Sequence, residues 1–342
     1  MKKFITTMFA VCIANPSFAA NISNKLVKAY HKEERSRTLL SHHDAILAGR
    51  TGTTTENGFF VEEFDPSTHE LNSSIKLRHS IRGLQSMDEC NVLAYGTSDY
   101  SVIDYCNKSA PASQTYAIGG GIVAHAGAYV GNDSFLFYEP NAGIVRLRLG
   151  GTPRKVAPKI SMTLSISFVA EKAWFANYSN LWMVDPNTGS KRAVFDKKNN
   201  FYGIRDSIGF RNSKGKEMLA ATSRESGKLL IVDASSGKMV EQLDLGKEPE
   251  GISQIGSCLA VSDSLEKQIY FVNLDEPNNK IIAKWDATAA GDKLKSPSKI
   301  AVDIATGQIF LRSSYPCPLC SVTQSSIYAF ETDDLEQIAD CL

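Results

Sequence analysis

The clearest indication of the fold is a short stretch that reads Leu181-Trp182-Met183-Val184-Asp185-Pro186-Asn187-Thr188-Gly189. Four strand-forming residues are followed by an acidic residue and by a turn that ends in glycine. A glycine at that place supplies the positive φ that a tight hairpin needs. The stretch therefore predicts a β-strand that turns back into a second strand.

The same unit recurs along the chain as a β-branched or aromatic strand, an acidic or polar turn and a second strand. Its seven copies occupy residues 59–65, 100–104, 135–139, 181–185, 229–233, 269–273 and 327–331. They lie about 45 residues apart on average, which matches the four short strands of one propeller blade. A β-sandwich would not repeat one hairpin seven times, and a βαβ array would need amphipathic helices between its strands. The sequence predicts an all-β, seven-bladed β-propeller with four antiparallel strands per blade.

One blade resembles those of a known family. It begins with Leu245-Gly246-Lys247-Glu248-Pro249-Glu250-Gly251-Ile252, its strands run to Asn273, and the turns at 184–189 and 232–237 follow the same pattern. This segment resembles the blades of the YVTN-type family of exported seven-bladed propellers, which are related in shape to the NHL and lactonase-like propellers. The resemblance implies the architecture and export, but it says little about activity, because propellers host many unrelated activities.

The first residues of the chain predict export. Lys2 and Lys3 form a basic start, residues 4–14 are apolar, and Pro16 breaks the run. Small residues before a cut after Ala19 complete the pattern of a cleaved secretory signal. The apolar run is shorter than the roughly 20 residues that span a bilayer, so a retained signal-anchor is the less favoured alternative. We expect a periplasmic or secreted protein with no transmembrane segment.

Three segments are expected in the chain: a signal peptide at 1–19, an N-terminal arm or cap at 20–38 and a single propeller domain at 39–342. Within the arm, residues 25–37 are rich in Lys, Glu and Arg and are interpreted as helix-like. The full chain has 37 basic and 37 acidic residues. This balance lacks the basic footprint of a dedicated nucleic-acid binder, so nucleic acid is not an expected partner.

Six of the seven cysteines remain after Cys12 leaves with the signal, and an even set in an exported protein predicts disulfides. Cys90 opens the second strand of the second blade, and Cys106 closes its third strand. Paired antiparallel strands place these two residues at the same end. We therefore expect a cross-strand disulfide between them.

The motif Cys317-Pro318-Leu319-Cys320 lies in a proline-rich loop of the last blade. A C-x-x-C can be a redox pair or half of a zinc site. Redox versions usually start a helix, which the prolines disfavour, and a zinc site would need a second C-x-x-C. We favour a structural staple in which Cys341 pairs with Cys317 or Cys320, and Cys258 has no obvious partner.

Propeller sites usually lie at the mouth of the central channel, on the loops that lead into the innermost strands. Alignment of the repeats predicts five residues near such positions: His42, Arg82, Tyr202, Glu250 and Lys299. A lactonase-like hydrolase would need several oxygen ligands around a divalent cation there, since calcium takes six to eight. Glu250 is the only clear acid in the set. We predict no cofactor and no metal, and keep a divalent cation for the hydrolase alternative alone.

The triplet His42-His43-Asp44 also suggests metal binding, because imidazole and carboxylate are zinc ligands. Neighbouring side chains on a strand point to opposite faces, so His42 and Asp44 could share an ion whereas both histidines could not. We favour the plainer interpretation, a polar start to a strand.

Three classes of function fit these patterns. The first is an exported, non-catalytic scaffold or binding protein that engages a protein or envelope component through a propeller face. The second is a metal-dependent, lactonase-like hydrolase with a site at the channel mouth. The third is the propeller subunit of a periplasmic oxidoreductase that is similar in layout to the amine dehydrogenases and needs a partner subunit carrying the cofactor. The sequence contains no catalytic constellation and many aromatic residues, which favours the first class.

Overall fold

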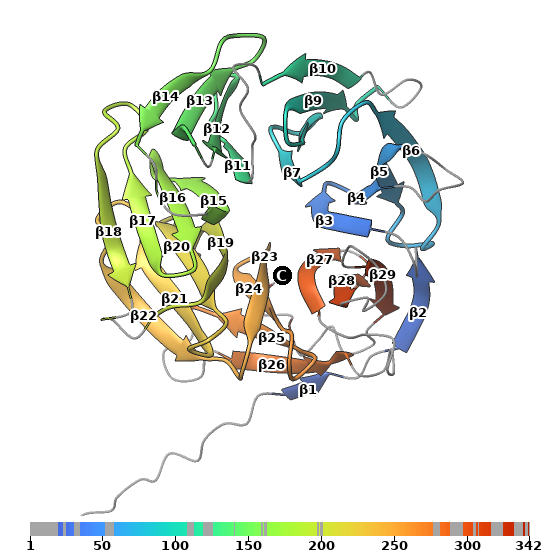
Figure 1. The fold of residues 1–342 in the computed structure, drawn as a ribbon. Coiled ribbons are helices and arrows are strands. Elements are labelled where there is room, and N and C mark those ends of the chain that lie inside the picture. Colours follow the sequence, from blue (N-terminus) through green and yellow to red (C-terminus); the bar gives the residue numbers. More distant parts are fainter. Residues whose placement is uncertain are drawn as a thin grey trace, which may run out of the picture.

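Seven blades stand around a central axis in the computed structural model (Figure 1). The structure describes residues 20–22, 25–30, 35–51, 58–107, 113–118, 126–139, 141–158, 160, 163–196, 198, 201–275, 281–287, 297–303, 306, 308–315, 324–331, 338 and 341. Over these residues the fold is all-β, with four antiparallel strands in each blade and no α-helix. The predicted architecture is confirmed.

Blades 1 to 3 each run outward from the axis in chain order. Blade 1 consists of β3 (Arg35–His42), β4 (Ala45–Thr51), β5 (Phe59–Phe64) and β6 (Leu71–Leu77). Blade 2 consists of β7 (Gly83–Ser86), β8 (Asn91–Tyr95), β9 (Asp99–Asp104) and β10 (Ser113–Ala117). Blade 3 consists of β11 (Ala126–Tyr129), β12 (Ser134–Glu139), β13 (Gly143–Arg148) and β14 (Arg154–Ala157).

Blades 4 to 6 repeat the same order. Blade 4 consists of β15 (Thr163–Val169), β16 (Lys172–Asn177), β17 (Asn180–Val184) and β18 (Lys191–Asp196). Blade 5 consists of β19 (Ile204–Arg211), β20 (Glu217–Ser223), β21 (Lys228–Asp233) and β22 (Met239–Asp244). Blade 6 consists of β23 (Pro249–Ile255), β24 (Cys258–Asp263), β25 (Gln268–Asn273) and β26 (Ile281–Asp286), with β1 (Ala20–Ile22) parallel to its outer edge.

Blade 7 is built from both ends of the chain. Its inner strands are β27 (Pro297–Asp303), β28 (Gln308–Tyr315) and β29 (Gln324–Glu331), and its outer strand is β2 (Lys25–Tyr30), which pairs antiparallel with β29. The helix-like interpretation of residues 25–37 is therefore wrong, because residues 25–30 form β2 and residues 35–37 begin β3. Pairing with a strand about 300 residues away overrides local propensity here.

The repeated acidic residue has a local reason. Asp185 Oδ1 accepts hydrogen bonds from the backbone N–H groups of Asn187 (2.9 Å) and Thr188 (3.1 Å), which fixes the turn after β17. Gly189 closes this turn with a φ of 74°. Asp233 and Gly237 repeat the arrangement after β21.

The repeat is displaced by one strand in blade 3. In the other six blades the predicted unit forms the third strand, but residues 135–139 lie in β12, the second strand. All six residues of β12 are buried, which explains its strong strand signal. The more polar β13 is the third strand, so the count of blades is right although the position of this copy is not.

The core is divided among the seven seams between neighbouring blades, and each seam holds one buried apolar cluster. Trp174 lies between blades 4 and 5, and Trp285 between blades 6 and 7, and both are fully buried. The blades therefore stabilise one another in sequence around the ring. In the described part of the chain, no helix is long and apolar enough to cross a membrane.

Two disulfides are present among the described residues. Cys90 and Cys106 are joined beside the β8–β9 pair, with 5.0 Å between their Cα atoms, as predicted. Cys341 is joined to Cys258 rather than to Cys317 or Cys320, so that prediction is wrong. Cys341 lies beside blade 6 instead, where the Ser257 N–H donates to its carbonyl (2.9 Å). Cys317 and Cys320 lie outside the described residues, as does the predicted signal peptide at 1–19.

Candidate functional site: the channel and the upper face

The direction of the strands defines two faces of the ring. Every blade starts at its innermost strand, so all seven innermost strands begin on one face, which we call the upper face. The turns between second and third strands reach this face too. The turns between first and second strands, and between third and fourth strands, lie on the opposite, lower face.

A cavity of about 450 Å³ occupies the axis, and all seven innermost strands contribute to its lining. In five blades the innermost strand carries one extra residue near its start, so its register shifts against the second strand. Such a bulge re-aims the side chain that follows it. The residues directly after these five shifts all line the cavity: Thr38, Ser165, Asp206, Ile252 and Lys299.

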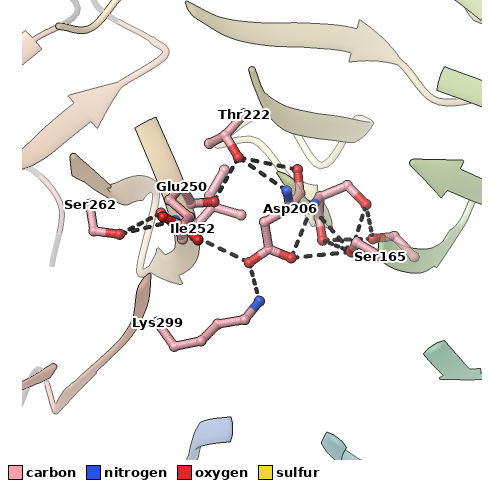
Figure 2. A network of polar contacts seen from close by, with 10 residues as sticks. Ser165, Asp206, Thr222, Glu250, Ile252, Ser262 and Lys299 are labelled. Atoms are coloured by element: carbon pink, nitrogen blue, oxygen red, sulfur yellow. Dashed lines mark hydrogen bonds and ion pairs between the residues drawn. The ribbon is translucent and has the colours of Figure 1, made fainter. Parts of the chain in front are cut away.

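Asp206 is the centre of a polar network at the cavity wall, as Figure 2 shows. Its Oδ1 accepts hydrogen bonds from Ser165 Oγ (3.1 Å) and the Ser207 N–H (3.0 Å). Its Oδ2 accepts from the Ile252 N–H (3.4 Å) and forms an ion pair with Lys299 Nζ, which comes from blade 7. Four donors from four blades thus converge on one carboxylate that is almost completely buried.

Thr222 supports this network from the second strand of blade 5. Its hydroxyl donates to the Glu250 carbonyl (2.8 Å) and accepts from the Asp206 N–H (3.2 Å) (Figure 2). The Asp206 N–H lies next to the bulge, where regular pairing with β20 is interrupted. Thr222 therefore satisfies a backbone group that the bulge would otherwise leave unpaired.

Two of the five predicted channel residues line the cavity. Lys299 lines the cavity as the partner of Asp206. Arg82 lines it just before β7, where its backbone N–H donates to the Tyr95 carbonyl (2.7 Å). Tyr95 also lines the cavity, and burial raises the pKa of its hydroxyl to about 12, so the phenol stays neutral. The channel wall is polar, but its carboxylate is already neutralised.

Glu250 and Tyr202 lie on the upper face but not in the lining of the cavity. The carbonyl of Tyr202 accepts a hydrogen bond from Ser223 Oγ, and the side chain is half-buried. Burial raises the pKa of Glu250, although Arg224 and Arg205 oppose the shift. Glu250 therefore belongs to the seam between blades 5 and 6.

His42 lies away from the other four residues, because it ends β3 and so faces the lower side of the ring. Its Nδ1 is 3.0 Å from Ser86 Oγ, and burial lowers its pKa, which favours the neutral ring. His43 and Asp44 form the β3–β4 turn rather than a strand start. Over the residues that the structure describes, no group of three or more His, Cys, Asp or Glu side chains could hold a metal ion.

Two exposed apolar side chains stand on the upper face. Tyr178 lies in the β16–β17 turn and is 45% exposed, and Leu265 lies in the β24–β25 turn and is 57% exposed. The sequence reasoning missed both, and it also missed Asp206. A single sequence contains no signal for the bulge that aims Asp206 inward, whereas an apolar residue at a predicted turn could have indicated Tyr178 and Leu265.

Comparison with known proteins shows which solved structures have a similar fold. No protein-family model matches the chain, and neither does any curated protein. The WD40 domain of Pan2 from Neurospora crassa is similar, with a TM-score of 0.62 and 10% identity over 88% of this chain and 90% of that one. Hsv2 from Kluyveromyces lactis has a TM-score of 0.56 at 10% identity, over 87% and 99% of the two chains. The chain is a seven-bladed β-propeller whose structural neighbours include WD40 domains.

Proposed function

We propose that this chain is an exported, non-catalytic binding protein that engages a protein or envelope component through the upper face of blades 4 to 6. The observation that carries the proposal is the exposure of Tyr178 and Leu265 on this face. Aromatic and aliphatic anchors of this kind supply much of the affinity in protein interfaces when charged groups surround them.

Both anchors stand on turns that are fixed by side-chain hydrogen bonds. Asn177 Oδ1 accepts from the backbone N–H groups of Ser179 (3.0 Å) and Asn180 (2.7 Å). In the same way, Asp263 Oδ1 accepts from the N–H groups of Leu265 (2.9 Å) and Glu266 (2.7 Å). A partner that binds here would order little of the backbone, which lowers the entropic cost of association.

Charged groups surround the anchors on the same face. The Arg205 guanidinium lies 6.0 Å from the centre of the Tyr178 ring. Arg224 forms an ion pair with Glu248 (2.6 Å), and Glu248 also accepts from Ser264 Oγ (3.0 Å). This mixture of two apolar anchors and a charged surround is typical of a transient protein interface.

The hydrolase and oxidoreductase alternatives receive less support. Asp206 is the one carboxylate that lines the cavity among the described residues, and Lys299 and three other donors already occupy it. A divalent cation would have to displace these donors and would still lack the further oxygen ligands it requires. A redox role would depend on a second subunit.

The two disulfides indicate that the chain folds in an oxidising environment. Together with the predicted signal at 1–19, this supports a periplasmic or secreted location. The blade at 245–273 still supports membership of the YVTN-type propellers. We keep 39–342 as the proposed propeller domain, to which the segment at 20–38 contributes β1, β2 and the start of β3.

The test is photo-cross-linking of the mature protein in an extract of its native envelope. The double variant Tyr178→Ala/Leu265→Ala should lose the cross-linked partner that the unchanged protein captures. The matched control is Leu71→Ala, since Leu71 is also 45% exposed but lies on the outer strand of blade 1. Equal capture by the double variant, or turnover of a lactone panel by the unchanged protein, would contradict the proposal.

A further inference from the structure

Three arginines gather in one pocket on the lower rim of blade 3. The pocket has a volume of about 500 Å³ and is lined by Asn132, Ser134, Arg146, Arg148, Thr152 and Arg154. It lies where the β11–β12 turn and the β13–β14 turn approach each other, on the face opposite to Tyr178 and Leu265. It is thus separate from the surface that the proposed function uses.

The strand register forces the three charges together. Arg146 on β13 lies directly opposite Arg154 on β14, so their Cβ atoms are about 5 Å apart. Arg148 is two residues beyond Arg146 and therefore projects from the same face of the sheet. Like charges in directly opposed positions destabilise a sheet. The arrangement therefore lowers the stability of the folded protein.

No acidic side chain within the described residues forms an ion pair with these arginines. Among the residues that the structure describes, the partner of the Arg146 guanidinium is a neutral group, Asn187 Oδ1 of blade 4, at 3.3 Å. Arg148 and Arg154 are exposed at the pocket rim. The remaining polar lining comes from Asn132, Thr152 and Ser134. The Asn132 amide and the Thr152 hydroxyl are suitable donors to an anion, whereas the Ser134 hydroxyl already donates to the Asn132 carbonyl (3.2 Å).

We propose that this pocket binds an anion that carries two or more phosphate or sulfate groups. Guanidinium groups bind such oxyanions with paired hydrogen bonds, and three of them at this spacing suit a ligand with several charges. Bound anion would offset the repulsion that the register imposes. The protein has equal numbers of acidic and basic residues, so general basicity does not explain the cluster.

A structural role for the arginines makes the opposite prediction about stability. If their aliphatic stems merely cover the sheet, Arg154→Gln should lower the melting temperature. If the pocket is an anion site, the same change relieves repulsion, and the ligand-free variant should melt about 1 °C higher than the unchanged protein. The sign of this shift separates the two interpretations.

Binding is tested with tripolyphosphate by isothermal titration calorimetry on the mature protein. The unchanged protein should bind with a Kd below about 1 mM, and Arg154→Gln should weaken binding about ten-fold. Arg146→Lys keeps the charge but loses the planar fork, and it should also weaken binding. The matched control is Arg211→Gln, since Arg211 is exposed in blade 5 and pairs with Glu217 (3.3 Å), and it should bind as the unchanged protein does.

A second arm separates a soluble ligand from a membrane-borne one. Cardiolipin in phosphatidylcholine vesicles presents the same phosphate chemistry on a membrane surface, and vesicles without cardiolipin are the control. Arginine-dependent binding of tripolyphosphate alone would assign a soluble ligand, and preferential binding of cardiolipin vesicles would assign a lipid headgroup. The proposal is overturned if neither probe binds, if Arg211→Gln weakens binding as much as Arg154→Gln, or if Arg154→Gln lowers the melting temperature.

Discussion

The channel and the lower rim of blade 3 differ in whether their charged side chains have partners within the protein. In the channel, one carboxylate, Asp206, is surrounded by four donors from the protein itself. At the rim, Arg146, Arg148 and Arg154 share a pocket without an acidic partner within the described residues. A charge that is satisfied internally stabilises the fold, whereas a cluster left uncompensated is available to a ligand.

Removal of the central carboxylate is expected to cause the largest loss of stability. Asp206→Ala leaves Lys299 unpaired and removes an acceptor from Ser165 and the Ser207 N–H. We expect a loss of about 3 kcal/mol in the free energy of unfolding, measured by urea denaturation. Lys299→Met should cost less, because Asp206 keeps three donors and the lysine is partly exposed. A larger loss for Lys299→Met would show that the network is not centred on Asp206.

A smaller effect is expected from Thr222→Val, which keeps the shape of the side chain and removes only its hydroxyl. The Asp206 N–H at the bulge and the Glu250 carbonyl would then lose their partner. The expected loss is about 1–2 kcal/mol by the same urea measurement. Thr188→Val, in an exposed turn, is the control and should change stability little. An equal loss in both variants would contradict a special role for the bulge.

The ion pair at the turn after β17 gives a further test, because it makes stability depend on pH. Lys172 lies 2.9 Å from Asp185 and, with backbone N–H groups, lowers the pKa of that carboxyl to about 2. Because the folded pKa is below the unfolded value, this stabilisation is complete above about pH 4 and is lost as pH falls toward 2. Asp185→Asn should cost about 1 kcal/mol at neutral pH and make the acid limb of stability shallower, as followed by denaturation at several pH values. A parallel acid limb in the variant would exclude this contribution.

Local patterns in the sequence predicted what local physics determines. The seven strand–turn units, the Asp185 and Asp233 turns and the Cys90–Cys106 disulfide all depend on residues that are close in the chain. Arg82 and Lys299 line the cavity, and the repeat points to them because they lie at the starts of repeated strands.

Features that depend on distant pairing were not predictable. The bulge before Asp206 becomes visible only when β19 and β20 are aligned, and a shift of one residue changes which side chain faces the axis. The Cys258–Cys341 disulfide depends on the course of the chain after β29. His42 was grouped with the channel residues because the strand boundaries around it were misjudged, and it ends its strand instead of starting it.

The shared construction of blade 7 has a consequence for how the protein folds. Leu26 pairs with Phe330, so a contact that closes the ring joins segments that leave the ribosome long apart in time. Contacts of such high sequence separation raise the contact order and slow folding. Blades 2 to 5 can form while synthesis or translocation continues, but the ring cannot close until β29 has emerged. Until then β2 lacks its partner strand, and an unpaired strand of this kind is prone to aggregation.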